Sequence, residues 1–185
     1  MKKTTIIGIS RGCQFSPNHI DNDAAIFTLV AEKLKEMGKA LERDSEEELA
    51  DRSVDGRFVI NMARDKATIQ KLKQMEDDGA TVINSAYGIE NCVRKPMTEL
   101  LIKNGIPHPA SIITGTDRPF PGNQFPCWIK RGDSHAIVKE DVSYATTLEE
   151  ANAILSQFNE RGIPEAVVNE HLQGDLVKFY GVCGS

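Results

Sequence analysis

Short apolar runs alternate with amphipathic segments along the first half of the chain. The apolar runs are as short as buried strands and lie at residues 4–9, 40–42, 57–61 and 80–84. Between them, apolar side chains recur at every third or fourth position over about 23–37 and 65–78, and glycine follows both segments, at Gly38 and Gly79. Strands that alternate with helices predict a parallel α/β sheet over residues 1 to about 90.

The second half of the chain has short strands joined by turns. The strand-like runs occupy residues 125–130, 136–138, 166–172 and 176–182. Thr147 and Glu150 have the spacing of a helix capping box, and the amphipathic segment behind them ends at Gly162. A proline-rich stretch over 113–125 indicates a structured connector without a helix or a central strand. The pattern predicts an antiparallel sheet from about 105 to 180, with the 147–161 helix against one face.

The composition limits the kinds of partner. The chain has 185 residues, a net charge of −5 and no block of Lys or Arg longer than two or three residues, which argues against a nucleic-acid surface. No apolar run approaches the ~20 residues of a membrane span, and the stretch after Met1 is too short for a signal-peptide core. The four cysteines form no CxxC pair and are expected to be reduced and mostly buried. We therefore expect a cytoplasmic protein that binds neither nucleic acid nor membrane.

Two polar segments in the first half are candidates for chemistry. The loop 10–19 follows the first strand, where α/β folds bind ligands, but it lacks a GxGxxG motif. An irregular surface loop that leads into a capped helix is the alternative. The acidic run 44–48 could hold a metal, whereas the spacing of Ser45 and Glu48 is that of a capping box. The capping box favours a solvated helix start over a metal cluster.

The order of elements in the second half resembles the small lid subdomain of the ATP-grasp superfamily, whose members hold ATP between two antiparallel sheets. The features that carry the resemblance are Lys130 at the end of a strand, the run 170–175 and, upstream, the run 91–96, the helix 97–104 and the segment 105–109. The resemblance covers about residues 60–182. It implies an α/β domain of the pre-ATP-grasp type over 1–92, followed by an α+β antiparallel lid subdomain over 93–185.

The resemblance implies that Lys95 and Lys130 hold the α- and β-phosphates of ATP. Lys95 precedes a proline at a helix start, where an anion is favoured. Lys130 ends an apolar strand, so its ammonium group must leave the sheet toward water or an anion. The alternative is a pair of ordinary surface lysines.

The strand that ends near residue 172 corresponds by position to the hinge that meets the adenine edge. The resemblance implies that the region of Glu170 and His171 meets the adenine amino group and that the amide of Leu172 meets a ring nitrogen. Asp175 would then meet the ribose hydroxyls, and Lys178 is a further candidate for binding ATP. An edge strand with an ordinary turn is the alternative.

The loop after the first lid strand departs from the family pattern. It has one glycine where the family commonly has several, so the phosphate cradle must rely on Arg131, Ser134 or His135. His135 is also similar in position to a histidine that faces the phosphoryl acceptor in the inositol-phosphate kinase branch, although a satisfied loop histidine is the alternative. Arg64, at the carboxyl end of a strand, is a candidate for binding an anionic substrate or an ordinary surface arginine. Arg64 and His135 are therefore the candidates for a catalytic role.

The magnesium-binding carboxylates of the family lie well beyond the hinge strand, whereas this chain ends at Ser185. We therefore expect no metal ligands within this chain, and Mg²⁺ only together with a missing C-terminal part. The pattern is that of the first half of a longer enzyme, as a fragment, a truncated product or one chain of a split enzyme. Alone, the chain is expected to have no turnover and weak affinity for ATP, and to form a homo-oligomer through the apolar edge 176–182.

These features predict the ATP-binding portion of an ATP-grasp ligase, which forms an acyl phosphate from a carboxylate and joins it to an amine or a similar nucleophile. The partners implied are ATP and a small anionic substrate. One alternative is an ATP-dependent small-molecule kinase, suggested by His135 and the run 178–180. The other is a non-catalytic nucleotide-binding or scaffold module. Lys95, Lys130 and Asp175 gathered around one cleft would favour the nucleotide-binding functions.

Overall fold

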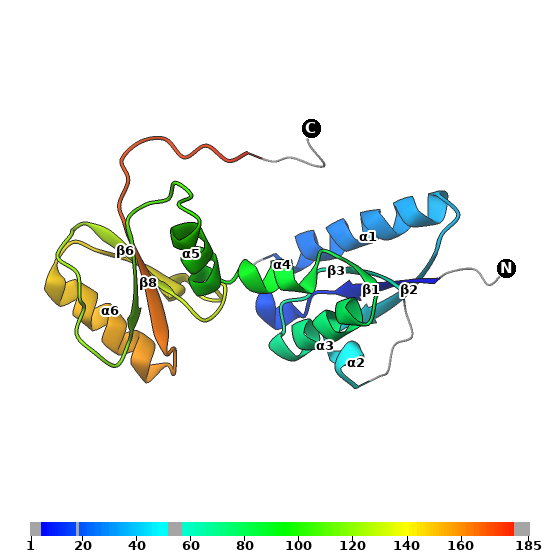
Figure 1. Ribbon diagram of the computed structural model, residues 1–185, viewed down its shortest axis with the longest axis horizontal. Helices are drawn as coiled ribbons and strands as arrows, with labels where there is room; N and C mark the ends of the chain where they lie inside the picture. The colour runs from blue at the N-terminus through cyan, green and yellow to red at the C-terminus, as the bar shows by residue number, and fades with distance from the viewer. Residues whose placement is uncertain (1–4, 18, 52–56, 180–185) are drawn as a thin grey trace.

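The computed structural model describes residues 5–17, 19–51 and 57–179, which form two units (Figure 1). The first unit contains β1 (Thr5–Ser10), η1 (Cys13–Phe15), α1 (Ile20–Glu36), β2 (Ala40–Ser45), α2 (Glu46–Asp51), β3 (Phe58–Asn61), α3 (Lys66–Asp77), β4 (Thr81–Ile83) and α4 (Ala86–Asn91). The second unit contains α5 (Arg94–Lys103), β5 (Ser111–Gly115), β6 (Cys127–Arg131), η2 (Lys139–Asp141), β7 (Val142–Ala145), α6 (Leu148–Glu160) and β8 (Glu165–Glu170). No helix within these ranges is long and apolar enough to cross a bilayer.

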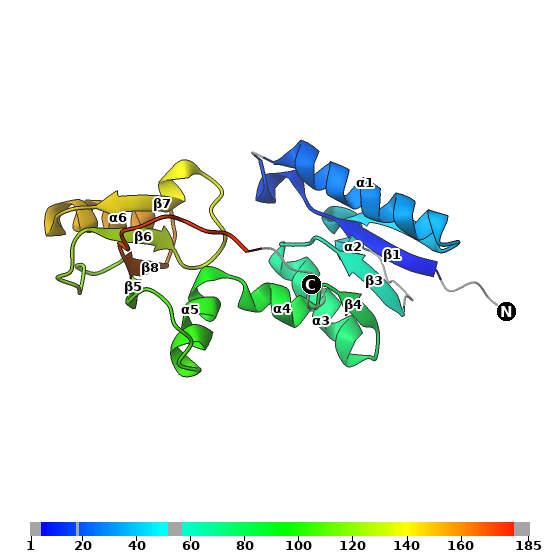
Figure 2. The same cartoon turned by 90° about the horizontal axis from the view of Figure 1, so that it is seen from above.

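The first unit is built on a parallel sheet with the strand order β2-β1-β3-β4. Helix α1 covers one face of the sheet, and α2 and α3 cover the other (Figures 1 and 2). The core between the sheet and α3 consists of aliphatic side chains, among them Ile9, Val59 and Leu72. The sheet confirms the predicted parallel α/β arrangement, and the carboxyl end of β1 faces the second unit (Figure 1).

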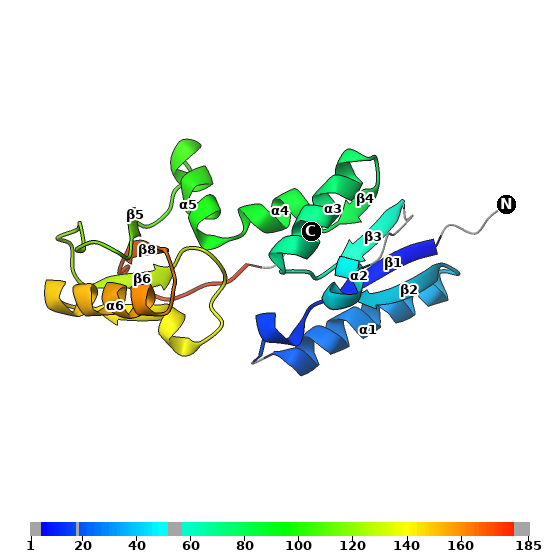
Figure 3. The ribbon, with the colours of Figure 1, turned by 90° about the horizontal axis from the view of Figure 1, so that it is seen from below.

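The second unit, which we call the lid, is built on a separate antiparallel sheet with the order β5-β8-β6-β7. Helix α6 packs against one face, where its buried Leu155 and Phe158 meet Cys127 and Ile129 of β6. Helices α4 and α5 lie between the two sheets and connect them (Figure 3). Two sheets of different kind, with α6 against one face of the second, confirm the predicted fold class.

Two lid segments that were predicted as strands are not strands in the structure. In the segment 136–138, the backbone N–H groups of Ile137 and Val138 donate to Asp141 Oδ2 at 2.7 and 3.2 Å, so they cannot pair with a neighbouring strand. The partner of β6 is instead β7, which begins at Val142. Residues 176–179 form no strand, and Phe179 is 92% exposed, whereas residues 180–182 lie outside the described ranges.

Two further sequence interpretations need correction. The edge strand β5 includes residues 113–115, which the sequence assigned to the proline-rich connector, and it pairs with β8, which lies far along the chain. The cysteines are less buried than expected: Cys127 is in the lid core, whereas Cys13 and Cys92 are exposed. Cys183 lies outside the described residues.

The start of α6 is held by a side-chain cap. Thr147 Oγ1 accepts a hydrogen bond from Glu150 N at 3.2 Å, and the Glu150 carboxylate accepts from Thr146 N at 2.7 Å. We expect Thr147→Ala to lower the free energy of unfolding by about 1 kcal/mol, because one backbone donor of the first turn loses its acceptor. Urea unfolding measures the change. Ser156→Ala, on the exposed face of the same helix, is the control, and equal effects of the two variants would contradict the cap.

Candidate functional site

A cleft lies between the two units, at the carboxyl ends of β1 and β3. In the order β2-β1-β3-β4, the strand that follows β1 in the chain lies on one side of it, and β3 lies on the other side. The connections after β1 and β3 therefore run in opposite directions, and parallel sheets commonly bind ligands at this kind of switch point. On the β3 side, the cleft contains a cavity of about 550 Å³, which is lined by residues that follow β3, by α3 to α5 and by the lid. The polar residues that line it are Arg64, Lys66, Gln70, Glu90, Lys95, Glu99, Asp133, His135 and Glu165.

Buried Glu46 holds the loops on the first-unit side of the cleft. Its side chain accepts from the backbone N–H groups of Gly12 at 2.7 Å, Arg64 at 3.0 Å and Asp65 at 2.5 Å. These contacts tie the loops after β1 and β3 to the start of α2. Glu46 is only 2% exposed, which corrects the expectation of a wholly solvated helix start.

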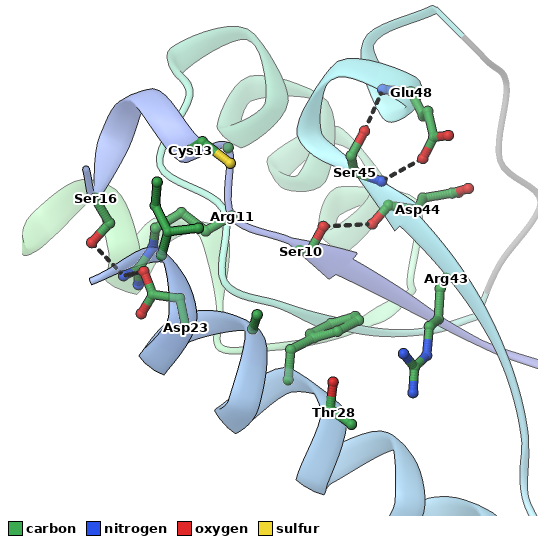
Figure 4. Close-up of a pocket in the computed structure, with 14 residues that line it drawn as sticks. Ser10, Arg11, Cys13, Ser16, Asp23, Thr28, Arg43, Asp44, Ser45 and Glu48 are labelled. Carbon is green, nitrogen blue, oxygen red and sulfur yellow. Dashed lines mark hydrogen bonds and ion pairs between the residues drawn. The ribbon is translucent and has the colours of Figure 1, made fainter. Parts of the chain in front are cut away.

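The predicted capping box at the start of α2 is present. Ser45 Oγ accepts from Glu48 N at 3.2 Å, and Glu48 Oε2 accepts from Ser45 N at 2.7 Å (Figure 4).

The loop after β1 is anchored by Arg11. Its Nε atom donates to the Met62 carbonyl at 3.1 Å, and its Nη1 atom pairs with Asp23 of α1 at 2.8 Å (Figure 4). Arg11 and Asp23 also line a cavity of about 410 Å³ between α1 and the ends of β1 and β2. Figure 4 shows that the hydroxyl of Ser10 points toward the Asp44 backbone in this cavity, where it donates to the carbonyl at 3.2 Å. The loop 10–17 is therefore an ordered wall beside the cleft.

The lid presents a polar and aromatic face on the side away from α6. Because side chains alternate along a strand, Cys127 and Ile129 point into the α6 core, and Trp128 and Lys130 point to the opposite face. The register places Trp128 opposite Tyr144 of β7, with ring centroids 4.8 Å apart. Trp128 Nε1 also lies 3.1 Å from His171 Nδ1. This face thus combines an aromatic cluster with the ammonium group of Lys130.

Lys130 and Arg94 are half-buried cations on this side of the lid. Burial, followed by the nearby charge of Arg94, lowers the pKa of Lys130. Burial is also the main cause that lowers the pKa of Arg94, whose Nη1 donates to the Arg131 carbonyl at 3.3 Å. Neither cation has an ion pair with a carboxylate in the part of the chain that the structure describes. Two such cations near each other favour a bound anion.

The loop after β6 is positioned by Asp141, which is fully buried. Asp141 accepts from the N–H groups of Ile137 and Val138, from Arg131 Nη1 at 3.3 Å and from Arg161 Nη2. Between the two ends of this loop, the N–H groups of residues 133–136 donate to no acceptor in the described ranges. The loop therefore offers backbone donors although it has only one glycine.

The predicted phosphate-binding residues have different surroundings. Lys95 lines the cleft cavity, and its ammonium group pairs with Glu165 at 2.5 Å, which raises the pKa of Lys95. Arg131 is paired with Asp133 at 2.9 Å and with Asp141. The hydroxyl of Ser134 donates to the His135 carbonyl at 3.0 Å.

Arg94 was missed by sequence reasoning. Helix α5 begins at Arg94, two residues before the proline that the sequence placed at the first helical position. In this helix Arg94 lies near Lys130, whereas the ammonium group of Lys95 pairs with Glu165. The only signal in the sequence was a second basic residue beside Lys95.

The predicted hinge residues are distributed along the end of β8 and the segment after it. The Glu170 carboxylate accepts from Ala110 N at 2.7 Å and is therefore tied to the start of β5. His171 belongs to the aromatic cluster. Leu172 is exposed, and its backbone N–H has no acceptor among the described residues. Asp175 and Lys178 are exposed on the segment that leaves the lid and runs toward the first unit (Figure 1).

His135 is a neutral imidazole among cations. Burial, followed by the charges of Arg64, Arg94 and Arg11, lowers the pKa of His135 to about 4. At pH 7 the ring therefore carries no charge and can accept a hydrogen bond from a ligand. Arg64 and His135, which the sequence singled out separately, line the same cavity.

The carboxylates around the cleft do not fit a magnesium site. Asp133, Glu90 and Glu165 are each engaged by a cation, and the described ranges contain no group of three or more His, Cys, Asp or Glu side chains that could hold a metal ion. The cations and open loop amides instead fit a polyphosphate.

Comparison with known proteins identifies the fold. Neither the protein-family models nor the curated proteins give a match to this chain. Among solved structures, D-alanine–D-alanine ligase from Bacillus anthracis is similar over 92% of this chain, with a TM-score of 0.68 and 16% identity. The structure of that ligase with ATP gives a TM-score of 0.67 at 15% identity. The RimK domain ATP-grasp protein from Sphaerobacter thermophilus gives 0.61 at 16% identity over 92% of this chain.

The chain therefore has the ATP-grasp fold, and the similarity extends over 92% of the chain in both structures. N5-carboxyaminoimidazole ribonucleotide synthetase from Thermotoga maritima shares this fold, with a TM-score of 0.54 and 21% identity over 90% of this chain. The present chain spans 58% of the length of the Bacillus anthracis ligase, 65% of the RimK domain protein and 45% of the synthetase.

Proposed function

We propose that the chain holds ATP against the open face of the lid, as part of an ATP-dependent carboxylate–amine ligase. The observation that carries the proposal is the pair Lys130 and Arg94, two half-buried cations without a carboxylate partner in the described ranges. They lie beside the aromatic cluster of Trp128, Tyr144 and His171 and beside a loop with open amides. An adenine ring needs an apolar slot, and a polyphosphate needs cations and backbone donors.

In the proposed reaction, a carboxylate oxygen of the second substrate attacks the γ-phosphorus of ATP, and the bond to the β-phosphate oxygen breaks with release of ADP. An amine then attacks the carbonyl carbon of the acyl phosphate and loses a proton as inorganic phosphate leaves. Lys130 and Arg94 would offset the charge of the transferring polyphosphate. Arg64, across the cleft, would orient the anionic second substrate.

A small-molecule kinase is the second candidate, and His135 is the observation that favours it. A neutral imidazole can accept a hydrogen bond from the hydroxyl group of a phosphoryl acceptor. Product analysis separates the two functions, because the ligase releases inorganic phosphate with an amide product and the kinase leaves the phosphoryl group on its substrate.

The assignment of Arg94 to the phosphates has its own test. We expect Arg94→Met to weaken ATP binding about tenfold in calorimetric titration, because a charge-assisted contact contributes about 1.5 kcal/mol. Lys95→Met is expected to change the affinity less, because Lys95 is already paired with Glu165. Lys103→Met, at the exposed end of the same helix, is the charge-matched control. If Lys95→Met weakens binding and Arg94→Met does not, the roles of the two residues are reversed.

A further inference from the structure

Arg64 stands at the junction of two cavities. It lines the cleft cavity of about 550 Å³ together with His135, and a neighbouring cavity of about 290 Å³ together with Arg11 and Ile137. Its backbone N–H is held by Glu46, and its Nη1 donates to the Phe15 carbonyl at 3.3 Å. Burial, followed by the charge of Arg11, lowers the pKa of Arg64. The guanidinium group has no ion pair with a carboxylate in the described ranges.

The carboxylates around this cleft are largely neutralised already. The ion pairs are Asp23 with Arg11 at 2.8 Å, Asp133 with Arg131 at 2.9 Å, Glu90 with Lys73 at 2.8 Å and Glu165 with Lys95 at 2.5 Å. Glu99 is exposed and acts electrostatically on Lys95. The charges of Asp23 and Glu46 also act on Arg64, although neither carboxylate forms an ion pair with its guanidinium group in the described ranges. Arg64 is therefore a cation of the first-unit wall without an ion pair there, separate from Lys130 and Arg94 on the lid.

The hydrogen-bond donors that line this cavity outnumber the two acceptor oxygens of a carboxylate. Arg64 supplies a guanidinium group from one wall, and the His135 imidazole lies on the other. The neutral His135 imidazole has one N–H donor, and protonation adds a second. A carboxylate has two oxygens, whereas a phosphate monoester has three terminal oxygens and a charge of about −1.5 to −2 at pH 7.

We propose that Arg64 and His135 form a site for a phosphate group of the second substrate, distinct from the ATP-binding face of the lid. The role as a substrate site rests on the proposed function, whereas the anion site itself rests on the geometry of the cleft. The enzyme would thus act on a carboxylate substrate that also carries a phosphate monoester. Arg64 would hold the phosphate, and His135 would donate to it through a ring N–H.

Binding tests the site directly with inorganic phosphate as the probe in calorimetric titrations. We expect phosphate to bind, and Arg64→Met and His135→Gln each to weaken it at least about tenfold, the loss typical of a charge-assisted contact. Lys66→Met removes one positive charge from the same cavity and is the matched control, with an expected change below about twofold. Equal effects of the three variants, or no binding by the wild type, would overturn the proposal. Circular dichroism and thermal unfolding establish that each variant is folded.

The pKa of His135 provides a second test, because phosphate would not change it if His135 had only a structural role. In proton NMR spectra, the four histidines are separated by comparison with His135→Gln. Without phosphate, His135 is expected to titrate near pH 4. With saturating phosphate its pKa is expected to rise by more than about one unit, because a bound anion offsets the repulsion from Arg64, Arg94 and Arg11. An unchanged titration would overturn the proposal.

Two comparisons separate this site from the ATP-binding face. Lys130→Met is expected to lose ATP affinity and to keep the response of His135 to phosphate. If the chain binds phosphate but not ATP, the proposed function is refuted and the anion site remains. If the chain binds ATP but not phosphate, only the anion site is refuted. Glycerol phosphate is expected to bind at least about tenfold more tightly than acetate, because of its extra charge and oxygen. Equal affinities would assign the site to carboxylates instead.

Discussion

Replacing Lys130 with methionine is expected to weaken ATP binding about 30-fold. The ammonium group is half-buried beside Arg94 and has no carboxylate partner in the described part of the chain, so its charge is available to a phosphate. Loss of one charge-assisted contact corresponds to about 2 kcal/mol, and each 1.4 kcal/mol is a factor of ten. Methionine retains the length of the side chain and its packing. Isothermal titration calorimetry with ATP measures the change.

The stability of the same variant distinguishes a binding role from a structural one. Because Lys130 lies close to Arg94 and is partly desolvated, we expect Lys130→Met to be at least as stable as the wild type. Lys139→Met removes an exposed charge from the same lid and is the control, with ATP affinity within about twofold of the wild type. Equal losses of affinity in the two variants would show that only the net charge matters.

Replacing Asp141 with asparagine is expected to lower the free energy of unfolding by about 3 kcal/mol, because it breaks a buried charge network. The carboxylate is fully buried and accepts from the Ile137 and Val138 amides and from Arg131 and Arg161. The amide of asparagine cannot satisfy all four donors. Urea unfolding measures the loss, and Glu140→Gln, its exposed neighbour, is expected to change stability by less than about 0.5 kcal/mol. A similar loss in both variants would contradict the role of Asp141.

The effect of Asp141 should depend on pH in a defined direction. Burial acts to raise the pKa of Asp141, but the hydrogen bonds from Ile137, Arg161 and Val138 outweigh it, so the pKa lies below its ordinary value of 3.8. The contribution of the ionised group is therefore fully present above pH 3.8 and is lost as the pH falls through the lower value of the folded state. The stability difference between the wild type and Asp141→Asn should shrink over this acidic range. A difference that is constant with pH would contradict the assignment.

Local signals in the sequence were sufficient for much of the fold. The alternation of apolar positions distinguishes the parallel sheet from the antiparallel lid, and the caps at Ser45 and Thr147 depend on residues three positions apart. Glu46 could not be placed in this way. Its hydrogen-bond partners, Gly12 and Arg64, are 34 and 18 positions away. An acidic residue that the local sequence predicts to be solvated is therefore buried by tertiary contacts.

The candidate site was also predictable from the sequence only where local signals were sufficient. The position of Lys130 at the end of an apolar strand was enough to predict a cation that leaves the sheet. Which of Arg94 and Lys95 lies near Lys130 could not be predicted, because it depends on where α5 begins. Neighbouring residues of a helix point in different directions, so Arg94 lies near Lys130 and Lys95 pairs with Glu165. The segment 136–138 has the composition of a strand, but Asp141, a few positions later, takes its backbone donors.

The most direct test of the central claim, that ATP binds to the open face of the lid, uses the single tryptophan of the chain. Trp128 lies on that face with Tyr144 and His171, two positions from Lys130. We expect ATP to change the Trp128 fluorescence in a saturable way, with the same midpoint as in calorimetry, and Lys130→Met to shift that midpoint about 30-fold. Inorganic tripolyphosphate, which has no ring to meet the aromatic cluster, should compete with ATP without causing the change. Binding of ATP that leaves Trp128 fluorescence unaltered and is insensitive to Lys130→Met would place the nucleotide elsewhere and contradict the account.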